Sequence, residues 1–262
     1  MTTQHAPAPG HDIHRHDNHG FLHSVETGAA VDGPGMRFVY FMAGCLFRCL
    51  YCHNPDTWKL HNGRRVELED MLAEVAPYAG FLNFAGGVTF SGGEPMMQAA
   101  FVGRVAAEIK ARYGLHIALD TQGFLHHTVP DDWFDPIDLV MLDIKHIDPA
   151  RYLELTSQPL QPTLDCAERL VRLGKPLRIR YVLVPGWTDA QADIEGLADY
   201  VAGLKAQGGD VEMVEVLPFH QMGTSKWDKL GLEYRLRDTP TPTPEGTEAA
   251  RDIFRARGLV AT

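Results

Sequence analysis

From residue 24 onward, short apolar runs alternate with segments in which apolar residues recur at helical spacing. Six runs have the length and composition of buried strands: 37–42, 87–91, 116–120, 139–143, 177–184 and 211–217. Strands that alternate with helices are typical of a parallel sheet covered by helices. The pattern therefore predicts an α/β fold, either an incomplete barrel or an open doubly wound sheet. Periodicity alone does not distinguish the two.

The segments between these runs carry the helical signal. Three sets of apolar residues each share one helical face: Leu68, Met71, Leu72 and Val75; Val102, Val105 and Ile109; and Ile194, Leu197, Val201 and Leu204. Gly114 and Gly174 stand where two of the helices are expected to end.

Residues 1–23 differ from the rest of the chain. They are rich in His, Asp, Pro and Gly, and they hold six of the 13 histidines: His5, His11, His14, His16, His19 and His23. Such a segment buries too little apolar surface to offset the entropy lost on ordering. We therefore predict a disordered His-rich tail at 1–23 and a single domain at 24–262. Metal capture by the histidines is a less favoured alternative.

Composition narrows the classes of function. Of the 262 residues, 45% are hydrophobic, and no apolar run approaches the ~20 residues of a membrane-spanning helix. The formal net charge of -10 argues against nucleic-acid binding, which needs a basic surface. Four cysteines, three of them clustered, do not make a disulfide framework, and residues 1–23 lack the apolar core of a secretory signal. We expect a cytoplasmic protein that binds neither membrane nor nucleic acid.

Polar motifs follow all six predicted strands. The loop after the first strand holds three cysteines, and the motifs after the later strands are Ser91-Gly92-Gly93-Glu94-Pro95, Asp120-Thr121-Gln122-Gly123, Asp143-Ile144-Lys145-His146, residues 180–186 and Pro218-Phe219-His220. Parallel α/β folds bind ligands beyond the carboxyl ends of their strands. We therefore expect the six loops to meet at one rim.

The cysteine loop carries the strongest chemical signal. Cys45, Cys49 and Cys52 have the spacing Cys-x3-Cys-x2-Cys. A four-iron cluster normally takes four thiolates, so three ligands from one loop leave one iron open to a cofactor. A structural zinc knuckle is the alternative, but it needs four closed ligands, typically in two separated pairs. Cys166 is the only other cysteine, and its apolar helix-like surroundings favour a packing role.

Further candidates stand at the ends of the second, third and fourth strands. Gly93 lets the backbone approach a ligand closely because glycine has no Cβ. Asp143 and Lys145 are two apart on a strand continuation and should face the same side, so Lys145 can neutralise a ligand carboxylate. The candidate ligands of a small monovalent cation are Asp120, Thr121, Asp143 and the Met141 carbonyl.

The last two strands offer weaker candidates. His220 ends the sixth strand and is either a ribose or adenine contact or a satisfied core histidine. Arg178 and Arg180 alternate on the fifth strand and should face one side, where they orient a ligand or pair with acids. The Gly33-Pro34-Gly35 turn is interpreted as a tight entry to the first strand.

Together these motifs resemble the glycyl-radical-enzyme activating enzymes, a family of the radical S-adenosylmethionine (SAM) superfamily. The likeness covers nearly everything from Ser24 onward and is strongest in residues 31–38, 44–58, 88–94, 119–124, 141–145, 180–187 and 217–220. The resemblance implies an incomplete (β/α)6 barrel. Gln122 stands where the family usually shows Asn or Ser, and Pro95 where Ala is common.

The resemblance also implies cofactors and their ligands. A [4Fe-4S] cluster would be held by Cys45, Cys49 and Cys52. SAM would be bound by Tyr51, Cys52, His53, Gly93, Asp143, Ile144, Lys145 and His220. No protein residue is required as an acid or base.

The implied reaction needs two protein partners. Reduced flavodoxin or ferredoxin would deliver one electron under anaerobic conditions, and SAM would be cleaved to a 5′-deoxyadenosyl radical that removes hydrogen from a glycine of the partner enzyme. Many relatives carry an inserted ferredoxin-like module with further clustered cysteines, and its absence here favours the branch that acts on the glycine loop of pyruvate formate-lyase. The alternatives are a different glycyl-radical enzyme or a small-molecule substrate.

Overall fold

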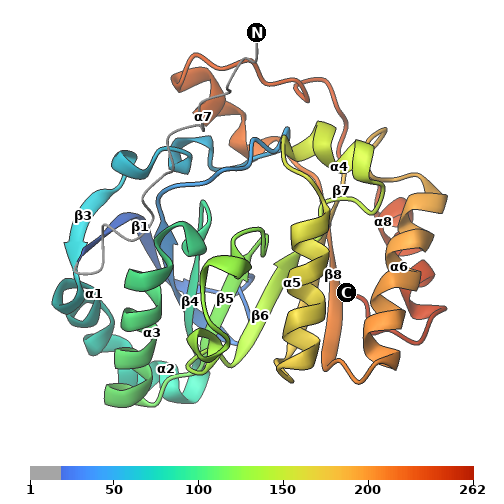
Figure 1. The fold of residues 1–262 in the computed structure, drawn as a ribbon. Coiled ribbons are helices and arrows are strands. Elements are labelled where there is room, and N and C mark those ends of the chain that lie inside the picture. Colours follow the sequence, from blue (N-terminus) through green and yellow to red (C-terminus); the bar gives the residue numbers. More distant parts are fainter. Residues whose placement is uncertain (1–18) are drawn as a thin grey trace, which may run out of the picture.

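A computed structural model describes residues 19–262, which form one eight-stranded sheet flanked by helices (Figure 1). The strands are β1 (His19–Ala29), β2 (Met36–Met42), β3 (Arg64–Glu67), β4 (Gly86–Gly92), β5 (Ile117–Thr121), β6 (Leu139–Asp143), β7 (Leu177–Leu183) and β8 (Val211–Pro218). Their order across the sheet is β3-β1-β2-β4-β5-β6-β7-β8. The six predicted strands match β2 and β4 to β8 to within one residue at each end.

The six predicted strands build an incomplete barrel. They pair in parallel and follow one another across the sheet in chain order. A doubly wound sheet reverses its strand order at a switch point, and this sheet does not. Among residues 19–262 the edge strands β3 and β8 are not paired with each other, so the barrel stays open. The incomplete (β/α)6 barrel is therefore confirmed.

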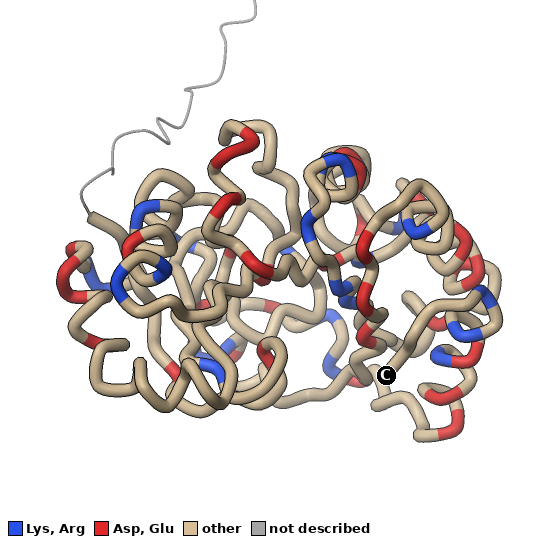
Figure 2. The backbone as a smooth tube through the Cα atoms, turned by 90° about the horizontal axis from the view of Figure 1, so that it is seen from below, with Lys and Arg blue, Asp and Glu red and all other residues tan. Residues whose placement is uncertain are grey.

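Eight helices accompany the sheet: α1 (Leu68–Val75), α2 (Ala79–Ala85), α3 (Ala99–Tyr113), α4 (Pro149–Thr156), α5 (Gln161–Arg172), α6 (Gln191–Ala206), α7 (Thr224–Lys229) and α8 (Pro244–Arg255) in the described part of the chain. The predicted apolar faces of α1, α3 and α6 are buried, apart from the half-buried Leu68. Gly114 ends α3 and Gly174 follows α5, both with a φ of 64° that favours glycine. Lys and Arg are interspersed with Asp and Glu along the outer helices (Figure 2).

Strands β1 and β3 were not predicted, and they extend the sheet beyond β2. β1 pairs antiparallel with both β2 and β3, so His19–His23 belong to a strand, and the disorder predicted for these five residues is wrong. Only Gly20, Leu22 and Ala29 of β1 are buried, and a half-exposed strand lacks the apolar run that marks a buried one. His5, His11, His14 and His16 lie outside the described residues.

The parallel strands are buried according to their place in the barrel. β4 and β6 are buried on both faces, as expected for parallel strands covered by helices. β7 alternates, with Leu177, Ile179, Tyr181 and Leu183 buried and its polar residues on the other face. Within residues 19–262 no helix has both the length and the apolar content needed to cross a membrane.

Candidate active site

All six parallel strands contribute to one cavity of about 250 Å³ beyond their carboxyl ends, as the order of the polar motifs predicted. β2 supplies the cysteine loop, and β4 supplies Ser91, Gly92 and the following Gly93. The lining residues from the other strands and the loops that follow them are Asp120 and Gln122, Asp143 and Lys145, Arg180 and Val182, and Leu217. The convergence places thiols, cations and carboxylates around one space.

The cysteine loop is held by a helix from the other half of the chain. It brings three thiols to the cavity wall: Cys45, Cys49 and Cys52. The Arg48 backbone N–H donates to the Thr156 carbonyl at 2.8 Å, and the Leu50 N–H donates to the Leu155 carbonyl at 3.0 Å. These bonds to α4 fix the middle of the loop, so the thiols are positioned before any ligand binds.

The three thiols need a positive centre to ionise. Burial raises the pKa of each, that of Cys49 to about 12. A bound metal deprotonates coordinating thiols because its charge replaces the lost hydration. Thiols that ionise only when they bind a metal therefore suit an iron–sulfur cluster.

A fourth thiolate is not in reach. Cys166 is buried against Gly123, where an added Cβ would lie 2.8 Å from its Sγ, and it does not line the cavity. In residues 19–262, no three His, Cys, Asp or Glu side chains are grouped to hold a single metal ion. The donor set fits a four-iron cluster with one open iron. It lacks the closed tetrahedron that structural zinc requires.

Gly93 is packed against the cysteine loop. Its N–H donates to the Met42 carbonyl at 2.9 Å, and the Glu94 N–H donates to the Gly44 carbonyl at 2.8 Å. A Cβ at Gly93 would lie 2.4 Å from the Gly44 oxygen and 3.2 Å from the Cys45 Cβ. Only glycine fits there, so the backbone of this turn is exposed to the cavity beside the thiols.

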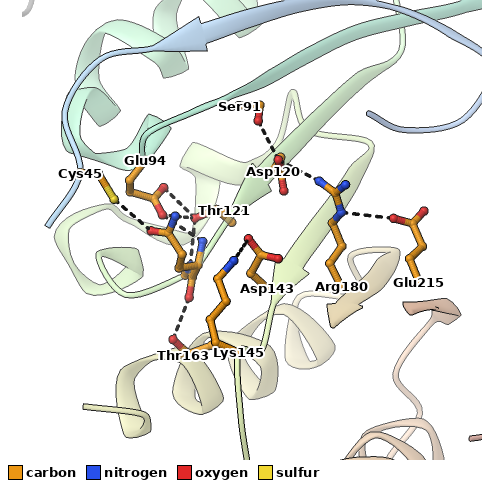
Figure 3. A network of polar contacts seen from close by, with 12 residues as sticks. Cys45, Ser91, Glu94, Asp120, Thr121, Asp143, Lys145, Thr163, Arg180 and Glu215 are labelled. Atoms are coloured by element: carbon orange, nitrogen blue, oxygen red, sulfur yellow. Dashed lines mark hydrogen bonds and ion pairs between the residues drawn. The ribbon is translucent and has the colours of Figure 1, made fainter. Parts of the chain in front are cut away.

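Glu94 anchors the same turn, a role that the sequence did not reveal. Its buried carboxylate accepts hydrogen bonds from the Met96 N–H at 3.0 Å, the Thr121 hydroxyl at 2.7 Å and the Gln122 N–H at 3.0 Å (Figure 3). Burial raises the pKa of Glu94 to about 7, although these hydrogen bonds act in the opposite direction. Glu94 thus ties the loop after β4 to the loop after β5.

Gln122 continues this network toward the thiols. Its side-chain amide donates to the Gly93 carbonyl at 3.1 Å, and its Oε1 lies 4.0 Å from the Cys45 Sγ. Its backbone carbonyl accepts from the Thr163 hydroxyl of α5 at 2.8 Å. Gln122 therefore bridges the glycine turn and the cysteine loop.

Lys145 and Asp143 face the same side, as predicted, and form an ion pair of 2.6 Å at the cavity wall. Burial alone lowers the pKa of Lys145, but the charges of Asp143 and Cys49 raise it more, so the ammonium stays protonated. Its Nζ lies 5.7 Å from the centre of the Tyr51 ring. Ile144, between them, is fully buried and does not line the cavity.

The predicted cation ligands lie on the neighbouring strands β5 and β6, where Asp120 pairs with Met141. Asp120 accepts from the Ser91 hydroxyl at 2.7 Å and from Arg180 at 3.0 Å (Figure 3), and its buried Oδ1 has no hydrogen-bond partner in the described part of the protein. The Thr121 hydroxyl is bonded to Glu94. Asp120 and Asp143 line the cavity, and cation binding at these strand ends stays a prediction.

The two arginines of β7 share one partner and therefore one side, as predicted. Glu215 of β8 lies 3.5 Å from Arg178 and 3.3 Å from Arg180. Arg180 extends from Glu215 to Asp120, so it joins β8 to β5 across the cavity floor (Figure 3). Of the two, only Arg180 lines the cavity.

Asp32 is a cavity residue that the sequence motifs did not single out. The loop between β1 and β2 carries it to the cavity, where it is half-buried. Burial, and then the charge of Asp120, raise the pKa of Asp32 to about 6. An acidic residue next to the Gly33-Pro34-Gly35 turn was the sequence feature that could have indicated this position in the cavity.

His53 lines the cavity, and the His220 ring, which does not line it, lies against the His53 ring with the two planes tilted by 36°. Their ring centres are 4.2 Å apart, and the His53 ring contacts the His220 carbonyl at 3.2 Å. Burial, and then the proximity of His220, lower the pKa of His53, so its ring is neutral at pH 7. Nearby, the buried Tyr51 hydroxyl has no hydrogen-bond partner within residues 19–262. A neutral imidazole and an unpaired hydroxyl suit an aromatic, polar ligand.

Comparison with known families identifies the class of this protein. The family described as the radical SAM superfamily matches residues 39–201. The chain therefore belongs to that superfamily, and its cofactors are a [4Fe-4S] cluster and SAM.

Relatives of known function identify the family within this superfamily. The pyruvate formate-lyase-activating enzymes of Staphylococcus aureus strains USA300 and COL are each 41% identical to this chain over 251 residues, which cover 92% of this chain and 97% of theirs. The chain thus belongs to the family of pyruvate formate-lyase-activating enzymes.

Solved structures share the fold. A domain of the pyruvate-formate lyase-activating enzyme from Bacteroides vulgatus is similar with a TM-score of 0.55 and 24% identity, covering 68% of this chain and 98% of that one. SuiB of Streptococcus suis, solved with S-adenosylmethionine, is similar with a TM-score of 0.64 and 16% identity, covering 88% of this chain and 50% of that one.

Proposed function

We propose that this chain activates pyruvate formate-lyase by generating a glycyl radical on it under anaerobic conditions. The observation that carries the proposal is the cavity in which three pre-positioned thiols face a glycine turn and a buried ammonium. Relatives with 41% identity bear the name of pyruvate formate-lyase-activating enzymes, which supports this substrate over a small molecule or another glycyl-radical enzyme.

The cysteine loop would hold the cluster through Cys45, Cys49 and Cys52. When bound, the cluster and SAM supply one-electron reduction and cleavage of a carbon–sulfur bond. The chain's own contribution is to keep three buried thiols at one wall and to leave the fourth position to the cofactor. Reduced flavodoxin or ferredoxin is the proposed one-electron donor.

The surrounding side chains would place the two ends of SAM. The Lys145 ammonium would neutralise the methionine carboxylate, and the exposed backbone of Gly93 would meet the amino group. The neutral His53 ring, with His220 packed against it and Tyr51 nearby, would contact the nucleoside end. Asp120, Thr121, Met141 and Asp143 would hold a monovalent cation next to the carboxylate. These groups orient the cofactor and exclude water.

The test is direct formation of the radical. Anaerobically reconstituted protein, mixed with SAM, a reductant and pyruvate formate-lyase, should give a glycine-centred doublet in electron paramagnetic resonance (EPR). Cys49→Ala should lose both the cluster and the doublet, because two thiolates do not retain the cube.

Cys166→Ala is the matched control, since Cys166 lies outside the cavity. This variant should keep the iron content and the doublet. An intact cluster that cleaves SAM but never yields the doublet would exclude pyruvate formate-lyase as the substrate. Iron loading that survives Cys49→Ala but not Cys166→Ala would overturn the ligand assignment.

A further inference from the structure

A stack of one cation and two indoles lies against the cysteine loop and has no part in the function proposed above. The Arg48 guanidinium carbon lies 4.8 Å from the centre of the Trp58 ring. Trp58 in turn meets Trp227 of α7 edge to face, with ring centres 5.2 Å apart and planes at 90°. We call these three residues the cation–indole stack. Each contact has the geometry of a favourable cation–π or aromatic pair.

The stack is bonded to both ends of the cysteine loop. One guanidinium nitrogen of Arg48 donates to the Cys45 carbonyl at 2.8 Å and to the Phe47 carbonyl at 2.6 Å. The Trp227 indole N–H donates to the Cys52 carbonyl at 2.8 Å. The Cys45 N–H donates to the Trp58 carbonyl at 3.1 Å. The first and last cysteines are therefore tied to one rigid assembly.

Arg48 brings a charge to this loop that no acid neutralises. Two other cations near the loop are paired, Lys145 with Asp143 and Lys226 with Asp56. In the described part of the chain no carboxylate lies within ion-pair distance of Arg48, whose side chain instead bonds two loop carbonyls. Its field therefore acts on the loop and on whatever the thiols bind.

Trp58 extends the stack to the cavity. It lines the same cavity as Cys52. The face of its ring lies against the Arg48 guanidinium and so holds this charge beside the cysteine loop.

We propose that the Arg48 guanidinium, held in place by the Trp58 ring, raises the reduction potential of the cluster and so eases its one-electron reduction. This inference rests on the proposed function, because it requires the cluster at the three thiols. Reduction adds one negative charge to the centre. A fixed cation beside the centre stabilises the reduced form more than the oxidised form, because it attracts the added charge.

The measurement is an EPR-monitored potentiometric titration of the anaerobically reconstituted full chain. Arg48 is exposed, so solvent screens part of its charge. Arg48→Gln should therefore shift the ratio of reduced to oxidised cluster about threefold toward the oxidised form at a given potential, which equals a fall of about 28 mV for one electron. Arg48→Lys keeps the charge and should recover most of this shift. Trp58→Leu removes the ring that holds the guanidinium, and it should lower the potential by a smaller amount.

Arg112→Gln is the matched control, because Arg112 is an exposed arginine on α3 that pairs with Glu69 and Glu108 away from the cavity. Its potential should equal that of the unmodified protein. Equal potentials in Arg48→Gln and the unmodified protein, at equal iron and sulfide content, would overturn the inference. If Arg48→Gln does not retain a cluster, an unchanged potential in Trp58→Leu overturns it instead.

The two proposals fail in different ways. Loss of the proposed function would appear in the unmodified protein, as a missing cluster or a missing glycyl radical. If the present inference is wrong, the unmodified protein still has its cluster and forms the glycyl radical. Only the difference in reduction potential between the variants is then missing.

Discussion

Replacing Lys145 with methionine tests how the cavity recognises the charged end of SAM. Lys145→Met keeps most of the side-chain volume and removes the ammonium that lies 2.6 Å from Asp143. A hydrogen bond to a charged group contributes about 1.5–3 kcal/mol. We therefore expect SAM to bind roughly 10- to 100-fold more weakly, while the absorbance and EPR spectra of the cluster stay unchanged.

The same substitution should also lower stability. It leaves Asp143 largely buried without its partner, and breaking a buried ion pair typically costs about 3–5 kcal/mol. Asp143→Asn in the same chain removes the stranded charge and should restore most of this loss without restoring SAM affinity. Stability and affinity thus separate in the double variant.

Anaerobic calorimetric titration with SAM measures the affinity, and urea unfolding of the cluster-free protein measures the stability. The control is Lys110→Met, which breaks an ion pair of the same 2.6 Å length with Asp138 away from the cavity. It should leave SAM affinity unchanged. Unaltered affinity in Lys145→Met, with its cluster intact, would refute the role of the ammonium.

Two further predictions concern the glycine turn. Gly93→Ala places a Cβ 2.4 Å from the Gly44 oxygen, so it should destabilise the protein by about 1–3 kcal/mol in thermal unfolding and reduce iron uptake; wild-type values for both would contradict the close packing. Because burial raises the pKa of Glu94 from 4.5 to about 7, the stability that its neutral form provides is complete below about pH 4.5 and is lost as the pH rises through 7. Glu94→Gln should flatten this dependence in urea unfolding between pH 5 and 8, and an equal slope in both proteins would show that Glu94 is already ionised.

The barrel strands were predictable because each carries buried apolar residues, on both faces in β4 and β6 and on one face in β7. The run 139–143 coincides with β6 for this reason. The six parallel strands lie side by side in chain order. The polar loops that follow their carboxyl ends were therefore expected to meet at one end of the barrel. The cysteine spacing alone identified the metal-binding loop, since few other sites place three thiols within eight residues.

Long-range partners were not predictable from local pattern. β1 is stabilised by pairing with β2 and β3 rather than by its own apolar content, so its start at His19 had no local signal. Glu94 and Gln122 acquire their roles from loops that are distant in sequence. Trp227 reaches the Cys52 carbonyl from α7, which the spacing of residues near the cysteines does not reveal.

The lack of pairing between β3 and β8 within residues 19–262 has a mechanical consequence. In a closed barrel the wall is a continuous ladder, and widening it breaks hydrogen bonds. Here β3 and β8 are not paired with each other within residues 19–262. The two halves of the barrel can therefore move apart by bending the sheet without breaking its interstrand hydrogen bonds. A folded segment of a partner protein can then enter the barrel from the side at a small cost in free energy.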